Sequence, residues 1–173
     1  MKNILYVEEP IEVKSAISFG LDLKETIIVA LTIRAQAFMK KNNINFKNTL
    51  KYFDNNAHAN CLKYSNNLVE SIEKTFFQNN VKYNAIYDWL SNSVRLSATN
   101  YIIFLIDVIN NSLNKHKPES IIIPKFKSSL LSGWSINQNQ YFHGELGKLI
   151  ALKQNIDIIE FEIDDYINLN SNI

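Results

Sequence analysis

Short apolar runs alternate with amphipathic segments in the first part of the chain. Asn3–Val7 and Thr26–Leu31 are rich in isoleucine and valine and are bounded by charged or turn residues, which is typical of strands buried on both faces. Between them, Ile11–Phe19 is expected to form a short helix. Arg34–Lys41 predicts a second helix and Ile44–Phe46 a brief third strand. The pattern therefore predicts a β-α-β-α-β start on a parallel sheet.

Two long amphipathic series fill the middle of the chain. In the first series, the apolar residues that recur at three- and four-residue steps are Ala57, Cys61, Tyr64, Leu68, Ile72 and Phe76. The second series comprises Tyr83, Ile86, Tyr87, Leu90, Val94, Ala98, Tyr101, Leu105, Ile109 and Leu113. Both predict helices that pack on each other and on the sheet. Their aromatic residues are interpreted as core filling rather than as an aromatic binding stripe.

The segment Glu119–Ile163 carries a strand, a polar loop, a helix and a second strand. Its first strand is the run Ser-Ile-Ile-Ile-Pro, and its loop is Lys125–Ser135. Its last strand alternates apolar residues with glutamates, in the order Ile159, Glu160, Phe161, Glu162 and Ile163. This alternation predicts a strand near a sheet edge, with one face toward water or a partner rather than toward a covering helix.

Length and composition set the domain organisation. With 173 residues, of which 46% are hydrophobic, the chain can bury one proper core but not two. We therefore predict a three-layer, Rossmann-like α/β domain over residues 1–165, with a mainly parallel sheet of about five strands and two long helices inserted in its middle. The Asn-rich residues 166–173 are expected to form a loosely held tail.

Charge and residue usage exclude several classes of function. A formal charge of +1 with scattered lysines makes nucleic-acid binding improbable. The single cysteine, Cys61, rules out an internal disulfide and favours a reducing compartment, so we expect a cytoplasmic protein. The longest apolar run, Tyr101–Ile106, is too short for a transmembrane segment. With four glycines, the chain has neither a dinucleotide-binding motif nor a P-loop.

The loop Lys125–Ser135 is a candidate binding loop because it follows the carboxyl end of a strand and precedes a helix. Its ammonium groups, at Lys125 and Lys127, and its hydroxyl groups, among them Ser135, suit a phosphate or a sugar hydroxyl. The alternative is an ordinary crossover loop whose apolar side chains cover the sheet. The sequence supports both readings about equally.

His143 and Glu145 lie where the following helix should begin, and they are the candidate proton acceptors. Gly144 and Gly147 flank them, and glycines so early in a helix indicate that another backbone or a ligand comes close. The alternative is close packing against the sheet. No second residue at a diagnostic spacing supports a general base at His143.

Polar residues also follow the first two strands, at Glu8, Thr32 and Arg34, and should face the same sheet edge. Arg34 could clamp an anion there, or it could be a solvated residue at a helix start. His58 and Cys61 are spaced for metal binding on a helix, yet no further pair completes a tetrahedral site. We therefore expect no metal.

Several stretches together resemble a known family. These are Thr-Ile-Arg-Ala-Gln-Ala-Phe-Met-Lys-Lys-Asn-Asn-Ile-Asn-Phe-Lys after the second strand, then Tyr-Phe-Asp ahead of a long helix, Ile-Ile-Ile-Pro-Lys, and Tyr-Phe-His-Gly-Glu-Leu. In their order they resemble the amino-terminal region of bacterial surface-polysaccharide biosynthesis proteins, many of them assigned as GT-B glycosyltransferases. The resemblance covers most of the chain, but its motifs are loose.

The resemblance implies an acceptor-binding role. In GT-B enzymes the amino-terminal domain usually holds the glycan acceptor, and a second Rossmann-like domain binds the nucleotide sugar. The loops at Glu8, Thr32, Lys125 and Tyr141 would then line an acceptor cleft in this chain. No cofactor is implied. The chain alone would lack the donor-sugar site, and no family motif assigns a catalytic role to His143.

A non-enzymatic α/β module that binds a partner protein, or a second copy in a homodimer, is the competing hypothesis. It would use the half-exposed last strand and predicts a stable dimer or complex. A small α/β hydrolase is disfavoured because the chain has no G-x-S-x-G elbow.

Overall fold

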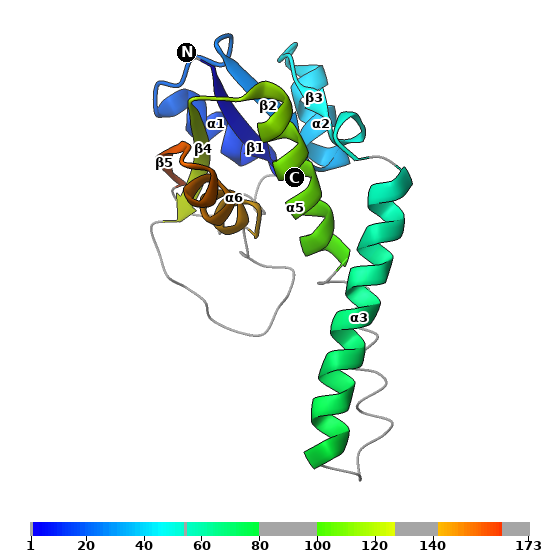
Figure 1. The fold of residues 1–173 in the computed structure, drawn as a ribbon. Coiled ribbons are helices and arrows are strands. Elements are labelled where there is room, and N and C mark those ends of the chain that lie inside the picture. The colour runs from blue at the N-terminus through cyan, green and yellow to red at the C-terminus, as the bar shows by residue number, and fades with distance from the viewer. Residues whose placement is uncertain (1, 54, 80–99, 127–141, 164–173) are drawn as a thin grey trace. The chain divides into compact units, whose positions relative to one another are not determined.

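The computed structural model describes residues 2–53, 55–79, 100–126 and 142–163, which contain a five-stranded, all-parallel β-sheet (Figure 1). The strands are β1 (Asn3–Val7), β2 (Thr26–Ala30), β3 (Lys47–Asn48), β4 (Ser120–Phe126) and β5 (Asp157–Ile163). The helices are α1 (Pro10–Ser18), α2 (Ile33–Lys41), α3 (Asn55–Asn79), α5 (Asn100–His116) and α6 (Phe142–Gln154), with a 3-10 turn at Thr49–Lys51.

The strand order is β3-β2-β1-β4-β5, so the chain starts in the middle of the sheet and winds outward in both directions. β1 pairs with β2 from Asn3 opposite Thr26, and with β4 from Asn3 opposite Ser120. The order therefore reverses between β1 and β4. In open parallel sheets, ligands bind beyond the carboxyl ends of the strands at such a reversal.

Alternation along the buried strands sends side chains to both faces of the sheet. On one face, Leu5 and Val7 of β1 join a core cluster with residues of α1 and α2, among them Val13 and Met39. The opposite face carries Ile4 and Tyr6 of β1 and Ile121 and Ile123 of β4, all buried. Helices thus cover both faces, as expected for a three-layer α/β fold (Figure 1).

Side-chain contacts identify the second covering layer. The Tyr6 hydroxyl lies 2.6 Å from Ser112 Oγ in the last part of α5. On α6, a Cβ added at Gly147 would lie 3.0 Å from Ile121 Cδ1, so this glycine allows the helix to approach β4 closely. Close packing is therefore a sufficient reason for a glycine at this position.

The chain divides into two compact units, residues 1–51 with 112–173 and residues 52–111. The first unit carries the sheet. In the second, Asn111 Nδ2 donates to the carbonyl of Tyr52 at 2.8 Å, and the rings of Phe53 and Phe104 meet edge to face at 5.0 Å. Within the described residues, no helix combines the length and apolarity needed to cross a membrane.

The predicted elements of the first unit are largely present. β1 has the predicted bounds, and α1 and α2 begin one residue earlier than predicted. The third strand was placed too early, because β3 consists of Lys47–Asn48. The reason is the end of α2, where Asn43 has φ 55° and Ile44 N–H donates to the carbonyl of Met39 at 2.9 Å. This helix end occupies residues that the apolar pattern had favoured for a strand.

The carboxyl-terminal half of the first unit differs in one detail. β4 continues through Phe126, so Lys125 belongs to the strand rather than to the following loop. β5 is the outermost strand beside β4, as the alternation predicts. Its glutamate face keeps contact with solvent, because Glu162 is exposed and the Glu160 side chain is 32% exposed, and Lys148 of α6 donates to Glu160 Oε1 at 2.7 Å.

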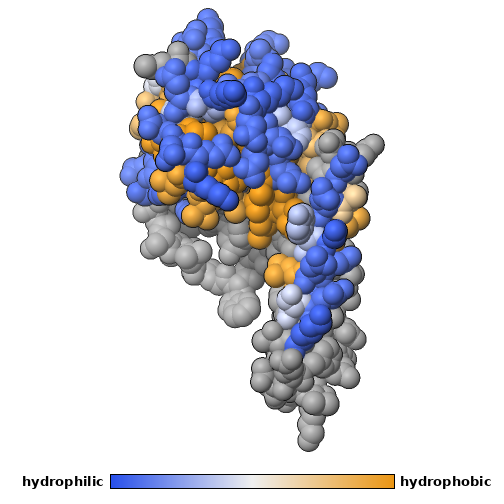
Figure 2. All heavy atoms as spheres, viewed as in Figure 1, coloured by the Kyte–Doolittle hydropathy of each residue, from blue (hydrophilic) through white to orange (hydrophobic). Residues whose placement is uncertain are grey.

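In the second unit, α3 lies where the first amphipathic series predicts a helix, but two residues of the predicted apolar series are exposed. Ser65 and Val69 are buried, whereas Tyr64 and Leu68 are 61% and 48% exposed. Figure 2 shows that the described part of α3 is largely hydrophilic on the face in view. α5 covers the end of the second series, and the rest of that series, residues 80–99, lies outside the described residues, as does the tail 166–173.

Candidate functional site

The candidate site begins at the turn between β1 and α1. Pro10 is the first residue of α1, where its missing N–H costs nothing, and Glu9 is the N-cap residue. Glu12, in the first turn, folds back so that its Oε2 accepts from Glu8 N–H at 2.6 Å and from Glu9 N–H at 3.2 Å. A carboxylate of the first helical turn therefore binds the two backbone donors that immediately precede the helix.

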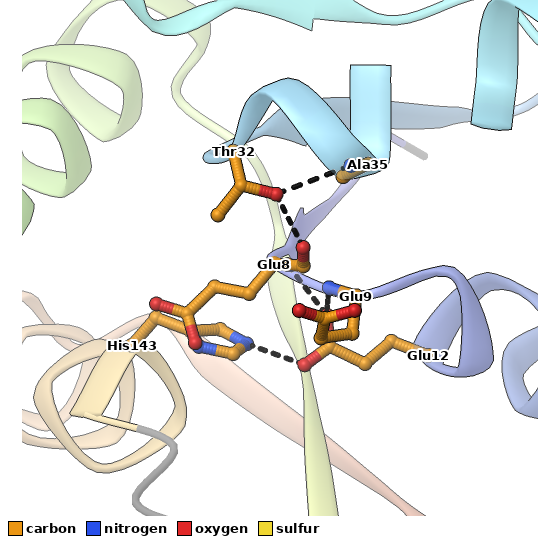
Figure 3. Close-up of polar contacts among 6 residues, drawn as sticks. All are labelled: Glu8, Glu9, Glu12, Thr32, Ala35 and His143. Carbon is orange, nitrogen blue, oxygen red and sulfur yellow. Dashed lines mark hydrogen bonds and ion pairs between the residues drawn. The ribbon is translucent and has the colours of Figure 1, made fainter. Parts of the chain in front are cut away.

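His143, in the first turn of α6, lies between two carboxylates at this turn (Figure 3). Its Nδ1 is 3.1 Å from Glu8 Oε2, and its Nε2 is 3.3 Å from Glu12 Oε1. The side chains of His143 and Glu12 are fully buried, and that of Glu8 is 15% exposed. We call Glu8, Glu12 and His143 the buried ion cluster.

The charge of His143 follows from these neighbours. Burial disfavours an imidazolium, but the charge and hydrogen bonding of Glu12, followed by those of Glu8, outweigh it and raise the pKa of His143 to about 10. The ring is therefore protonated on both nitrogens at neutral pH. The two nitrogen–oxygen distances, 3.1 and 3.3 Å, are those of ion pairs.

Thr32 joins the turn from the neighbouring strand. It is the N-cap residue of α2, where its Oγ1 accepts from Ala35 N–H at 3.1 Å, and its hydroxyl donates to the backbone carbonyl of Glu8 (Figure 3). Thr32 thus lies at the carboxyl-terminal edge of the sheet, where the sequence predicts it. In this structure it positions the turn that carries Glu8.

Arg34 lies at the same edge but in contact with a protein carboxylate. Its guanidinium is 3.3 Å from Glu9 Oε2, and its side chain is 63% exposed. Burial is the largest cause of a raised pKa of Glu9, Glu12 and Glu8 raise it further, and Arg34 opposes the shift. Arg34 therefore offsets part of the negative charge beside the buried ion cluster.

The remaining predicted site residues do not join the cluster where they are described. Glu145, on the first turn of α6, is exposed. Lys125 Nζ lies 3.5 Å from Glu160 Oε2, and Glu160 also binds Lys148. We call Lys125, Lys148 and Glu160 the exposed ion cluster. Lys127, Ser135 and Tyr141 lie outside the described residues.

Sequence reasoning missed Glu12, which is central to the site. A signal for it exists, because Glu9 and Glu12 have the spacing of a capping box around a proline that begins a helix. That spacing predicts a carboxylate folded onto the helix terminus. It does not predict the histidine that the carboxylate meets, because His143 is distant in sequence.

The arrangement favours proton and hydrogen-bond chemistry. Among the described residues, no group of three histidine, cysteine, aspartate or glutamate side chains could hold a metal ion, and in the buried ion cluster the two carboxylates bind the imidazole instead. Comparisons with protein-family models, curated proteins and solved structures find no match. The chemistry of the site is therefore the basis for a functional assignment.

Proposed function

We propose that this chain is the acceptor-side domain of a glycosyltransferase that builds bacterial cell-surface polysaccharide. The domain is Rossmann-like, and the glycan acceptor binds at the carboxyl ends of β1 and β4. The strand order supports this placement, because it reverses between these two strands. The quoted stretches that resemble bacterial surface-polysaccharide proteins support the choice of reaction.

The carboxylate of Glu12 is the observation that carries the acceptor-side role. In dinucleotide-binding α/β folds, a phosphate of the ligand binds the helix terminus after the first strand. Here the amides of Glu8 and Glu9 already donate to Glu12 Oε2, and its negative charge would repel a phosphate. The site therefore favours a ligand rich in hydroxyl groups over a nucleotide, and the donor nucleotide sugar is held by another domain.

Glu8 supplies the contact to the acceptor. It is the only member of the buried ion cluster with an exposed fraction above zero, and an ionised carboxylate accepts strong hydrogen bonds from sugar hydroxyls. The cluster holds two carboxylates and one imidazolium, so its net charge is negative when both carboxylates are ionised. A neutral or amino-bearing glycan fits that charge.

Binding measurements on the full chain test the proposal. Backbone amide NMR would follow titration with neutral and amino-sugar oligosaccharides, and separately with UDP, GDP and CMP. We expect oligosaccharides to shift the signals of residues around Glu8 and Thr32, and nucleotides to leave the amides of Glu8 and Glu9 unchanged. Glu8→Gln should weaken glycan binding about 10-fold or more, the loss for one hydrogen bond to a charged group.

The matched control is Glu25→Gln, which changes an exposed glutamate before β2 at the opposite edge of the sheet. It should bind glycans like the unchanged chain. Nucleotide binding at the Glu8 and Glu9 amides, without any oligosaccharide binding, would contradict the acceptor-side role.

A second candidate function is a partner-binding module, favoured by apolar residues that are exposed on two helices in contact with β5. Ile17 and Phe19, at the end of α1, are 51% and 54% exposed, and Leu149 and Leu152 of α6 are 63% and 59% exposed. A second copy of the chain could cover them. Light scattering across a concentration series should then show a dimer that Leu149→Glu dissociates, whereas a monomer at every concentration removes this candidate.

A further inference from the structure

We propose that the sheet edge beyond the carboxyl ends of β2 and β3 docks reversibly onto an anionic lipid bilayer, with Ile33 and Leu50 entering the membrane interface. We call these two side chains the apolar tips. A domain can bind a bilayer surface in this way without any membrane-spanning helix. The docking does not depend on the proposed function, because the apolar tips are not part of the buried ion cluster.

The apolar tips are the most exposed large apolar side chains in the part of the chain that the structure describes. Ile33 is 85% exposed and Leu50 is 76% exposed, whereas no other exposed large apolar residue there exceeds 63%. Single exposed apolar side chains are common on protein surfaces, but neighbouring ones mark an interaction site. The question is therefore whether the two tips lie together.

Strand pairing places both apolar tips at one edge of the sheet. β2 and β3 are parallel neighbours, with Ala30 opposite Asn48 where both strands end (Figure 1). Ile33 is the first residue of α2, just beyond β2, and Leu50 lies in the 3-10 turn Thr49–Lys51, just beyond β3. Because paired strands are only about 4.8 Å apart, the two tips emerge from adjacent positions on this edge.

Hydrogen bonds hold the two turns that carry the apolar tips. Asn48 links them, because its Oδ1 accepts from Leu50 N–H at 2.9 Å and its Nδ2 donates to Gln36 Oε1 of α2 at 3.3 Å. Thr32, directly before Ile33, caps α2 by accepting from Ala35 N–H at 3.1 Å. The backbone that presents the tips is thus ordered before any partner arrives, which lowers the entropic cost of docking.

The charge beside each apolar tip favours a bilayer as the partner. Arg34 follows Ile33 and Lys51 follows Leu50, and both cations are exposed. Arg34 already pairs with Glu9 at 3.3 Å, so Lys51 contributes the larger share of attraction to anions. At a membrane interface the apolar group enters the acyl boundary while the neighbouring cation stays at the anionic headgroups. The core of a protein interface is instead depleted of charge and enriched in aromatic residues.

Docking through the apolar tips also sets which edge of the sheet faces the membrane. Two aliphatic side chains and their cations give weak, reversible binding rather than stable anchoring. Thr32, next to Ile33, donates to the backbone carbonyl of Glu8. The turn that carries Glu8 therefore belongs to the docked edge of the sheet.

Vesicle sedimentation with the full chain tests the proposal, with vesicles of phosphatidylcholine alone or mixed with phosphatidylglycerol. The unchanged chain should bind the anionic vesicles more strongly than the neutral ones. Ile33→Glu and Leu50→Glu should each weaken binding about 10-fold or more, because full burial of such a side chain is worth at least that factor. Lys51→Gln should weaken binding to anionic vesicles about 5-fold, and added salt should reduce this difference.

Matched controls change the same residue types elsewhere on the sheet-bearing unit. Ile17→Glu alters an isoleucine that is 51% exposed near the end of α1, and Lys24→Gln alters an exposed lysine ahead of β2. Both positions lie toward the opposite edge of the sheet, because α1 starts at the carboxyl end of β1 and the chain then returns to the start of β2. Both variants should bind vesicles like the unchanged chain. Circular dichroism checks that every variant is folded.

Each other outcome overturns the docking. Absence of vesicle binding by the unchanged chain would do so, as would an equal loss in Ile17→Glu and Ile33→Glu, since binding would then not depend on the apolar tips. A dimer in light scattering that Ile33→Glu dissociates, without vesicle binding, would assign the tips to a second copy of the chain. Oligosaccharide binding near Glu8 is measured separately, so failure of the docking and failure of the proposed function are distinguishable.

Discussion

Two ion clusters hold α6 to its surroundings, and they are opposite in both charge and burial. In the buried ion cluster, one imidazolium lies between two carboxylates whose exposed fractions are 15% and 0%. In the exposed ion cluster, the Glu160 carboxylate lies 2.7 Å from Lys148 Nζ and 3.5 Å from Lys125 Nζ, with side chains that are 32%, 42% and 60% exposed. The shorter contact is thus in the exposed cluster.

The difference shows why distance alone does not predict how much an ion pair contributes to stability. The hydrogen bond between Lys148 and Glu160 raises the pKa of the lysine and lowers that of the glutamate, yet water screens their attraction. The His143 side chain has no exposed surface, so solvent does not screen its charge in the same way. Removal of one charge should therefore lower the free energy of unfolding much more in the buried ion cluster than in the exposed ion cluster.

Replacement of His143 should have the largest effect on stability. His143→Gln leaves Glu12 and Glu8 beside each other without the cation, and loss of one partner from a buried pair typically costs about 3–5 kcal/mol. Urea unfolding followed by circular dichroism measures this cost. Lys148→Gln is the matched control on the same helix and should shift the midpoint far less. Equal shifts in the two variants would show that burial does not separate the clusters.

A rise in pH should have the next largest effect. The pKa of His143 is about 10 in the folded chain against an ordinary value of 6.5, so the folded state holds this proton more tightly. The stabilisation is complete below pH 6.5 and is lost as pH approaches about 10, at about 1.4 kcal/mol per pH unit. Unfolding free energies measured from pH 6.5 to 9 test this slope. His143→Gln should flatten it, and an unchanged slope would mean that other groups cause it.

Replacement of Thr32 should have a smaller effect, because its contacts at the same turn are neutral. Thr32→Val keeps the shape but removes the acceptor for Ala35 N–H and the donor to the Glu8 carbonyl. Loss of this N-cap should cost about 1–2 kcal/mol in thermal or urea unfolding. Thr32→Ser keeps the hydroxyl and should stay close to the unchanged chain. If Thr32→Ser lost as much stability as Thr32→Val, the methyl group rather than the hydroxyl would be important.

Replacement of Glu160 should have the smallest effect. Glu160→Gln removes the carboxylate between Lys125 and Lys148, and we expect a loss below about 1 kcal/mol that shrinks further at high salt. Unfolding at low and high ionic strength measures both. A loss as large as that of His143→Gln, insensitive to salt, would remove the contrast between the clusters.

Local pattern was a good guide to the elements that need no distant partner. A short apolar run located β1 with its observed bounds, and α1 and α2 begin within one residue of their predicted starts. The pattern placed β3 too early. The backbone turn that follows α2, at Asn43, includes residues whose composition had favoured a strand. On α3, Tyr64 and Leu68 of the predicted apolar series are exposed, because burial of a helix residue depends on the neighbours that cover it.

Three of the predicted site residues lie together in the structure, but the chemistry of their contacts was not predicted. Glu8, Thr32 and His143 were expected at one sheet edge because each follows a strand or begins a helix there, and the structure brings them together. A solvent-accessible histidine would be a plausible base. Burial between Glu8 and Glu12 makes His143 a fixed cation instead, and no local spacing reports burial or a partner from a distant segment.

By itself, the sequence located β1, β2, α1 and α2, because these depend on side-chain periodicity and on neighbours within a turn. Only the tertiary structure decided the strand order, the placement of α6 over β4 and the pairing of His143 with two glutamates. The physical reason is that ionisation depends on desolvation and on charges within a few ångströms. Packing of distant segments sets both.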